Sequence, residues 1–248
     1  MDKTLFPFLL TSFAGLSTMI GFLFLYIKPK KEDHIIIGGL SFAAGVMIMV
    51  SFTDLLPESI RLLKVIYQPI PMILMVLLSF NVGMIISFLL DKYFPDNNTT
   101  LYRVGIISML AIMIHNIPEG IATFMAGSTN PNLGITMAIA IALHNIPEGI
   151  SISIPIYYAT KNKKKAFLCT LLSGLSELLG AVLTYLFLKN WITDQILGFL
   201  FAGIAGIMLH IAFYELLPTA LNYKKKEIVV SFFLSGFAFM LVSHILFH

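Results

Sequence analysis

Residues 111–121 read AIMIHNIPEGI, and residues 140–150 read AIALHNIPEGI. The two stretches are identical at nine of eleven positions and begin 29 residues apart, each within a long apolar run. Only the short segment GSTNPN, at residues 127–132, separates these two runs. Because a connection this short brings the chain straight back alongside itself, we expect two antiparallel helices whose equivalent residues are related by a pseudo-twofold axis in the membrane plane.

The remainder of the chain is also strongly apolar. Of its 248 residues, 58% are hydrophobic and 12% are charged, a composition typical of a protein embedded in a bilayer. A hydrocarbon core about 30 Å thick needs about 20 apolar residues per helix, so each run of that length is a candidate span. Eight such runs occur, at residues 5–27, 34–56, 70–90, 101–126, 133–158, 166–188, 192–218 and 228–247. We therefore expect an all-α membrane protein with eight transmembrane helices, in which residues 1–248 form a single transmembrane domain.

Other classes of protein do not fit this pattern. The runs are long and continuous and lack the period-two alternation of a membrane β-barrel. The first run follows Asp2 and Lys3 without a small-residue cleavage site, so we expect a retained helix rather than a signal peptide. A single cysteine, Cys169, excludes a disulfide framework or a thiolate metal cluster within one chain.

Positive charge is distributed unevenly between the connections. Twelve of the 16 Lys and Arg residues fall in the connections after the first, third, fifth and seventh runs, and four fall on the opposite side. The positive-inside rule then places the first set in the cytoplasm and both termini outside it. We interpret the basic segment KNKKK at residues 161–165 as an anchoring cytoplasmic loop, and we expect no nucleic-acid partner.

A second, weaker repeat flanks the central pair of helices. Residues 44–57 read AGVMIMVSFTDLLP, and residues 205–218 read AGIMLHIAFYELLP. In addition, GLST at residues 15–18 resembles GLSE at residues 174–177. We therefore expect the first three and the last three spans to be inverted repeats around the central pair, a 3+2+3 architecture found among secondary transporters.

The repeated hexapeptide HNIPEG carries side chains suited to a metal ion. Its His and Glu are four residues apart, so both project from one face of a helix. His115 with Glu119, and His144 with Glu148, would supply two imidazoles and two carboxylates near the bilayer midplane. Such a set suits zinc and other borderline divalent ions.

A second, oxygen-rich position is predicted beside the first. Each hexapeptide carries an asparagine next to its histidine, Asn116 or Asn145, and Glu177 lies deep in the sixth run. These three residues could together bind a second ion. Oxygen ligands alone would favour harder or more weakly held ions.

The prolines of the two hexapeptides, Pro118 and Pro147, have no N–H to donate. The carbonyl groups four residues earlier lose their helical partners, and such groups persist in a membrane only against protein or a wet cavity. We therefore expect the helix to break where the ligands lie. The alternative is that the prolines only kink the spans and that the hexapeptide glycines only permit close helix packing.

Buried negative charge favours a bound cation. Glu119, Glu148 and Glu177 lie deep in their predicted spans, where an ionised and unpaired carboxylate costs at least about 2.5 kcal/mol. With Arg103 assigned to a connection, we count no Lys or Arg inside a span that could pair with them. The compensating cation is then a proton or a metal ion, and the two histidines favour a metal. Protonated, hydrogen-bonded carboxyl groups remain the alternative.

Further polar residues lie near the ends of the flanking spans. Asp54 and Glu215 occupy equivalent repeat positions and could be carboxylates at the two mouths of a pathway, or simply interfacial acids at helix ends. His210 could line the exit or satisfy a local hydrogen bond. We assign no role to His34, His244 or His248, which lie at the membrane edges.

The hexapeptides, with SGLSELLG at residues 173–180, DLLPES at residues 54–59 and ELLP at residues 215–218, resemble the ZIP family of divalent metal transporters. They are most similar to its bacterial GufA/ZupT-type branch. The resemblance implies eight spans with both termini outside, and import of zinc across the cell membrane. Carried onto matching positions, it implies a first metal site of His115, Glu119, His144 and Glu148, and a second completed by Asn116, Asn145 and Glu177.

The resemblance also implies a mechanism and an assembly. It implies an elevator-like motion of spans one, four, five and six against the other four spans, and a homodimer. The sequence departs from the pattern in two places. Leu178 stands where this branch often has Pro after the Glu, and the connection between spans three and four lacks the His-rich cluster of many eukaryotic relatives.

The predicted function is transport of a divalent metal ion into the cytoplasm, by alternating access through a binuclear midplane site. Candidate cargoes are Zn2+, Fe2+, Mn2+, Co2+ and Cd2+, with transport driven by the metal gradient or coupled to protons through Glu119 and Glu148. The competing hypothesis is an intramembrane zinc-dependent hydrolase. A hydrolase predicts three ligands, an open position and a separate base, whereas the repeats here predict a symmetric site. We therefore predict no enzymatic activity and no catalytic residue.

Overall fold

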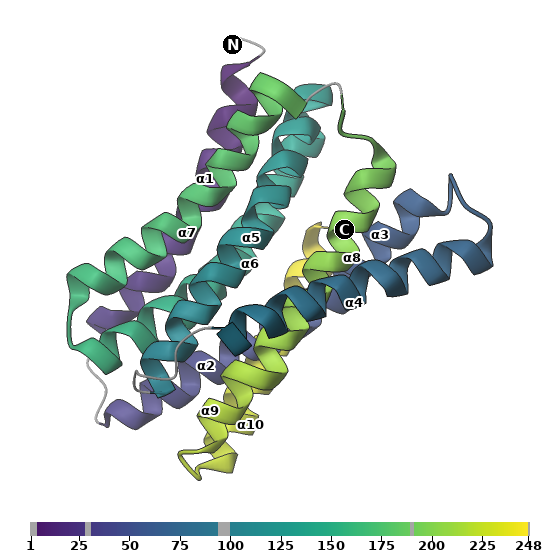
Figure 1. Cartoon of the computed structure of the whole chain (residues 1–248). Coiled ribbons are helices and arrows are strands. Elements are labelled where there is room, and N and C mark those ends of the chain that lie inside the picture. The colour runs from purple at the N-terminus through teal and green to yellow at the C-terminus, as the bar shows by residue number, and fades with distance from the viewer. Residues whose placement is uncertain (1–3, 28–30, 94–99, 189–190, 248) are drawn as a thin grey trace.

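The computed structural model describes residues 4–27, 31–93, 100–188 and 191–247, and every element within these ranges is helical. Figure 1 shows the chain, whose elements in order are α1 (Leu5–Leu23), η1 (Phe24–Tyr26), α2 (Glu32–Val50), η2 (Ser51–Leu55), α3 (Leu56–Leu63), α4 (Pro69–Tyr93), α5 (Thr100–Thr129), α6 (Pro131–Thr160), α7 (Lys163–Leu183), η3 (Thr184–Leu188), α8 (Asp194–His210), η4 (Ile211–Leu216), α9 (Leu217–Leu221) and α10 (Lys226–Phe247). Two parts of the chain discussed above lie outside the described residues. They are residues 94–99, in the connection between spans three and four, and His248.

Eight helical stretches of the described chain are long and apolar enough to cross a membrane, which confirms the predicted all-α fold with eight spans. These stretches are Leu5–Tyr26, Glu32–Leu63, Pro69–Tyr93, Thr100–Thr129, Pro131–Thr160, Lys163–Phe187, Asp194–Leu221 and Lys226–Leu246. The largest difference from the predicted boundaries is in the second span, which continues to Leu63 rather than ending at residue 56.

The connection between α5 and α6 is a single residue, Asn130. Its side-chain oxygen accepts hydrogen bonds from the backbone N–H groups of Asn132 (2.9 Å) and Leu133 (3.4 Å), and so caps the start of α6. Pro131 occupies the first turn of α6, where a missing N–H costs nothing. The two central helices are therefore antiparallel neighbours, as their short connection predicts.

The expected break at the hexapeptide prolines does not occur. α5 continues through Pro118, and α6 continues through Pro147 and Pro155. Both helices are mostly buried against other helices. Tertiary packing therefore holds the helix together across the lost backbone hydrogen bonds, as neighbouring helices commonly do in membrane proteins.

The helix is instead irregular in the flanking spans, at equivalent places in the two repeats. In spans two and seven the α-helix widens into a π-helical segment, Ser51–Leu55 (η2) and Ile211–Leu216 (η4). Each segment lies immediately before a Leu-Pro pair that starts the next α-helix, at Pro57 or Pro218. Widening the helix there relieves the clash between the proline ring and the preceding turn.

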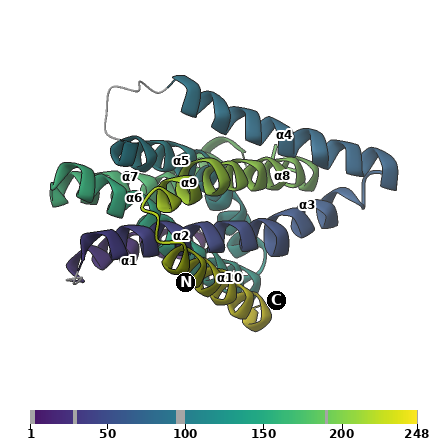
Figure 2. The same cartoon turned by 90° about the horizontal axis from the view of Figure 1, so that it is seen from below.

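The helices pack as two groups. In the first group, α1 and α5 both contact α6 and α7. In the second group, α2 contacts α9 and α10, while α3 and α4 contact α8. α2 against α6 makes the most extensive contact between the groups. In Figure 1 the two groups lie side by side, and Figure 2 shows α4 and α10 on opposite edges of the second group.

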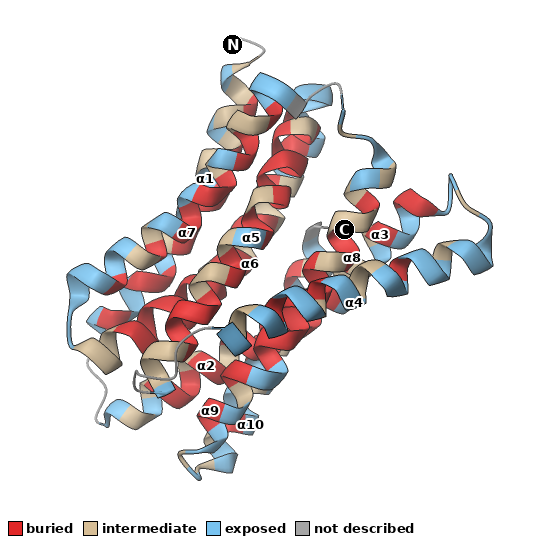
Figure 3. Cartoon of the chain, in the orientation of Figure 1, coloured by how far each residue is buried: buried red, intermediate tan, exposed pale blue. Residues whose placement is uncertain are grey.

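Burial differs between spans rather than between the two groups: in the most apolar window it is 78% for the span of α2 and α3, but 44% for those of α1 and α7. Figure 3 shows buried residues concentrated on the central helices, whereas the surface of α4 is largely exposed. In the most apolar window of each span, 72% of residues are buried for α5 but only 17% for α4 and 22% for α10. The exposed apolar faces of α4 and α10 therefore suit contact with lipid, and the first group encloses the polar residues of the hexapeptides.

Two glycines bring the flanking helices onto the hexapeptides. A Cβ atom added at Gly120 of α5 would lie 1.9 Å from the carbonyl oxygen of Glu177 in α7. A Cβ atom added at Gly149 of α6 would lie equally close to the carbonyl oxygen of Thr18 in α1. Only glycine permits so close an approach of two helices. The equivalent contacts place Glu177 directly beside the first hexapeptide.

Candidate metal centre

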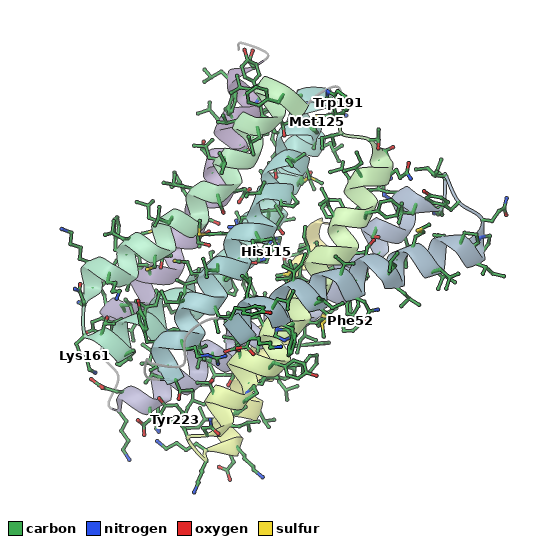
Figure 4. All side chains as sticks on the ribbon, viewed as in Figure 1. Phe52, His115, Met125, Lys161, Trp191 and Tyr223 are labelled. Atoms are coloured by element: carbon green, nitrogen blue, oxygen red, sulfur yellow. The ribbon has the colours of Figure 1, made fainter. Side chains whose placement is uncertain are left out.

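The histidines and glutamates of the two hexapeptides form crossed pairs between α5 and α6. His115 Nε2 lies 3.0 Å from Glu148 Oε1, and His144 Nε2 lies 3.3 Å from Glu119 Oε1. All four side chains are buried: His115 and Glu148 are 0% exposed, Glu119 is 2% and His144 is 5% exposed. Figure 4 labels His115 near the middle of α5. The hydrogen bonds therefore join the helices, instead of joining His to the Glu four residues later.

Each of these four side chains also has a buried atom without a hydrogen-bond partner. These atoms are Nδ1 of His115 and His144, and Oε2 of Glu119 and Glu148. A buried polar group left without a partner costs about 1–3 kcal/mol, and more if it is charged. Within the described residues, however, no three His, Cys, Asp or Glu side chains are close enough together to hold a metal ion. The ligand set therefore stays a prediction, and binding would require these side chains to rearrange.

The asparagines are held so that their oxygens remain available. Asn145 Nδ2 donates to the carbonyl oxygen of Ala14 (2.9 Å) and to Glu177 Oε2 (2.8 Å). Asn116 Nδ2 donates to the carbonyl oxygen of Ser173 (3.0 Å). The side-chain Oδ1 atoms of both asparagines and Oε1 of Glu177 are buried and have no hydrogen-bond partner. The amide donors are thus engaged, while three acceptor oxygens have no hydrogen-bond partner.

A cavity of about 910 Å3 leads to one of the two crossed pairs. Glu119 and His144 form part of its wall, whereas His115 and Glu148 do not. The other charged or histidine side chains of its wall are Asp54, Glu58, Arg61 and His244. The cavity lies between the two helix groups, because α2, α3, α8 and α10 face α5 and α6 across it. Of the four His and Glu side chains of the hexapeptides, Glu119 and His144 are thus the two that border the cavity.

The sequence interpretation missed His244. Its Nδ1 atom lies 2.5 Å from Oδ1 of Asp54, a residue 190 positions earlier, so no local pattern could have paired them. This hydrogen bond lies on the cavity wall. Asp54, one of the predicted pathway residues, therefore faces the cavity as a hydrogen-bonded pair with α10.

At the other end of the spans, a second cluster contains Glu215, Asp91 and Arg103. Arg103 lies inside α5, not in a connection as we expected, and its guanidinium pairs with Asp91 and lies 3.9 Å from Glu215 Oε1. His210 Nδ1 lies 2.9 Å from Ser87 Oγ, and its ring stacks on Tyr214 with centroids 4.9 Å apart. His210 thus bonds a side chain of another helix, α4, and its role as a pathway residue stays a prediction.

Comparison with known proteins identifies the family. Residues 96–244 match the family described as ZIP Zinc transporter. The chain is 40% identical over 265 residues to the zinc transporter ZupT of Chlorobaculum parvum, covering 99% of both proteins. It is 38% identical over 278 residues to ZupT of Clostridium perfringens, covering 100% of this chain and 98% of the relative. It is also 38% identical over 263 residues to ZupT of Streptococcus mutans, covering the whole of both. The chain belongs to the ZIP family of zinc transporters, so it is a multi-pass membrane transporter and not an enzyme.

Proposed function

We propose that this protein carries Zn2+ into the cytoplasm through a midplane site made by His115, Glu119, His144 and Glu148. The observation that carries the proposal is the cavity whose wall includes Glu119 and His144. An ion that reaches this pair meets an imidazole and a carboxylate whose second oxygen has no partner. The relatives named as zinc transporters support zinc as the cargo.

We further propose a second position made by Asn116, Asn145 and Glu177. Three buried oxygens without hydrogen-bond partners support it, one from each residue. This position supplies oxygen only, whereas the first supplies nitrogen as well. A binuclear site of this kind would admit Fe2+, Mn2+, Co2+ and Cd2+ beside Zn2+, in an order set by geometry and supply as much as by ligand type.

The division into two helix groups supports a mechanism of alternating access. All seven proposed ligands lie on α5, α6 and α7, in the first group, and none lies in the second group. Movement of the first group against the second would therefore carry the intact site, as in the hinge and shear motions of other proteins. With the basic connections in the cytoplasm and the termini outside, Asp54 would lie at the outer mouth and Glu215 with His210 at the inner mouth.

The remaining proposals concern the setting of the protein. We place the chain in the cell membrane as a single transmembrane domain. We also propose a homodimer, for which the mostly exposed apolar surface of α4 offers room. The dimer rests on family resemblance, and chemical cross-linking in native membranes tests it.

Metal uptake into proteoliposomes tests the function directly. Wild type should take up Zn2+, whereas Glu148→Ala and His115→Ala should each lower the initial rate at least tenfold. Loss of a group that only supports a metal ligand already costs about 10–100-fold, and loss of a ligand should cost no less. Glu227→Ala, an exposed acid in the first turn of α10, is the control and should transport normally. Wild type that moves no divalent metal would contradict the proposal.

A further inference from the structure

The two flanking helices of the first group carry the same five-residue pattern with two differences. Residues 14–18 of α1 read AGLST, and residues 173–177 of α7 read SGLSE. The helices cross at the equivalent glycines, because a Cβ atom added at Gly15 would lie 2.5 Å from the Gly174 carbonyl oxygen, and the reverse distance is 2.4 Å. The pseudo-twofold relation therefore holds here at the level of single atoms.

The hydrogen bonds to the asparagines obey the same relation. Asn145 donates to the carbonyl oxygen of Ala14, and Asn116 donates to the carbonyl oxygen of Ser173, which is the equivalent residue. The backbone framework of the second position is thus the same in both halves. The two halves differ in two side chains. α1 carries Ala14 and Thr18, where α7 carries Ser173 and Glu177.

Both of the α7 side chains have a buried oxygen without a partner. Ser173 and Glu177 are 0% exposed, and neither Ser173 Oγ nor Glu177 Oε1 has a hydrogen-bond partner. The two residues are one helical turn apart and therefore share a face of α7. Their face is the one that receives Asn116 and Asn145.

The other hydroxyl groups of these two segments are all satisfied. Ser17, Thr18 and Ser176 each donate to a backbone carbonyl oxygen one turn earlier, at 2.6, 2.7 and 2.6 Å. This is the usual behaviour of a hydroxyl group inside a helix. Ser173 departs from it, because its Oγ is buried without a hydrogen-bond partner. Four other buried hydroxyl groups of the described chain also lack a partner, at Ser41, Ser108, Thr123 and Ser243, but none of these lies on α7. Ser173 differs from them in its place one helical turn before Glu177.

We infer that Ser173 Oγ is an additional oxygen ligand of the second cation position, next to Glu177 Oε1 and Asn116 Oδ1. This inference rests on the second position proposed above. A neutral hydroxyl oxygen adds no charge and no soft donor, so it favours ions such as Mn2+ over Cd2+ at that position. Ser173 would then help to determine which metal ions the second position binds. Its counterpart on α1, Ala14, has no side-chain oxygen and cannot serve as a ligand.

The test is metal binding to the full chain reconstituted in lipid nanodiscs, measured by equilibrium dialysis and elemental analysis. Ser173→Ala should weaken Mn2+ binding about tenfold, in the range seen when a metal site loses a ligating or supporting group. Ser173→Cys replaces the oxygen with sulfur and should raise the preference for Cd2+ over Mn2+ at least tenfold. The matched controls are Ser176→Ala and Ser176→Cys, since the Ser176 hydroxyl is engaged by the Ser173 carbonyl oxygen. Both controls should bind metals as wild type does, and thermal unfolding checks that every variant is folded.

Two results would overturn the inference. One is a preference for Cd2+ over Mn2+ that is the same in Ser173→Cys as in wild type. The other is a Ser176→Cys variant whose preference for Cd2+ over Mn2+ changes as much as that of Ser173→Cys. Glu177→Ala separates this inference from the proposed function. If Glu177→Ala loses one bound metal per chain while both Ser173 variants bind normally, Ser173 is not a ligand but the second position exists. If Glu177→Ala keeps every bound metal, the second position is absent and the role of Ser173 is refuted with it.

Discussion

At the scale of single residues, the two hexapeptides depend on each other. His115 needs Glu148, and His144 needs Glu119, so neither pair forms unless α5 and α6 are in register. Removing one partner leaves the other buried and unsatisfied, at a cost of about 1–3 kcal/mol before any effect on metal. Variants of these four residues therefore need a stability measurement beside the uptake measurement.

Asp54 offers a test of the cavity that does not touch the proposed ligands. Asp54→Asn keeps a hydrogen-bonding side chain near His244 but removes a negative charge from the cavity wall. Because such charges raise the local concentration of a cation, KM for Zn2+ uptake should rise about threefold or more, while kcat stays unchanged. Initial rates over a range of Zn2+ concentrations measure both constants.

The control for Asp54 is Thr136→Val, which alters an uncharged side chain of the same wall. It should leave KM as in wild type. A fall in kcat for Asp54→Asn with KM unchanged would instead show that Asp54 acts after the ion is bound, which would contradict a role at the mouth.

At the scale of helices, close glycine contacts set the position of α7 against α5. Gly120→Ala would place a methyl group 1.9 Å from the backbone oxygen of Glu177, which cannot move without shifting the whole helix. We expect a loss of about 1–3 kcal/mol in stability, as for overpacked cores. The midpoint of thermal unfolding in detergent should fall accordingly.

Gly203→Ala is the matched control for this prediction. A Cβ atom at Gly203 of α8 meets only the carbonyl oxygen of Ser79, at an ordinary 3.5 Å. Because alanine has the higher helix propensity, this variant should be as stable as wild type or more stable. Equal unfolding midpoints for the Gly120 and Gly203 variants would refute the contact as a constraint.

The sequence predicts the helices well and their contacts poorly. Eight apolar runs are visible because each helix must be apolar along its whole length in a bilayer, whatever it packs against. The crossed pairs, the Asp54–His244 hydrogen bond and the cluster around Arg103 depend instead on the register between distant segments. No local pattern encodes that register.

The proline prediction was wrong for a related reason. Pro118 and Pro147 each remove one backbone hydrogen bond, which in an isolated helix favours a break. Here the surrounding helices keep α5 and α6 continuous. The irregularity appears at Pro57 and Pro218 instead, in spans where the repeat was recognised but the π-helical segments were not expected.

At the scale of the whole molecule, two neighbouring ion pairs lie at one end of the helices. One joins the two helix groups, and the other lies within the second group. Lys161, at the end of α6, lies 2.6 Å from Glu32 of α2 and joins the two groups. Lys225, before α10, lies 3.0 Å from Asp33 of α2 and stays within the second group. These neighbouring pairs allow a direct test of relative motion.

Cysteines at 32 and 161, in a Cys169→Ser background, can be joined by a bifunctional thiol reagent. If the groups must move against each other, this linkage should lower Zn2+ uptake at least tenfold, whereas the unlinked double variant should transport normally. Cysteines at 33 and 225 joined by the same reagent are the control and should leave uptake unchanged. Full uptake by the protein linked between 32 and 161 would refute movement of the groups.

The asymmetry of the cavity has a consequence for the cycle as a whole. Only Glu119 and His144 meet the cavity, yet the helices that carry the ligands are related by a pseudo-twofold axis down to single carbonyl contacts. If the two repeats exchanged conformations, His115 and Glu148 would instead be exposed, toward the opposite end of the spans. The repeat symmetry thus predicts the second state of the proposed cycle from the first: with the two halves exchanged, the form that loads the ion becomes the form that releases it.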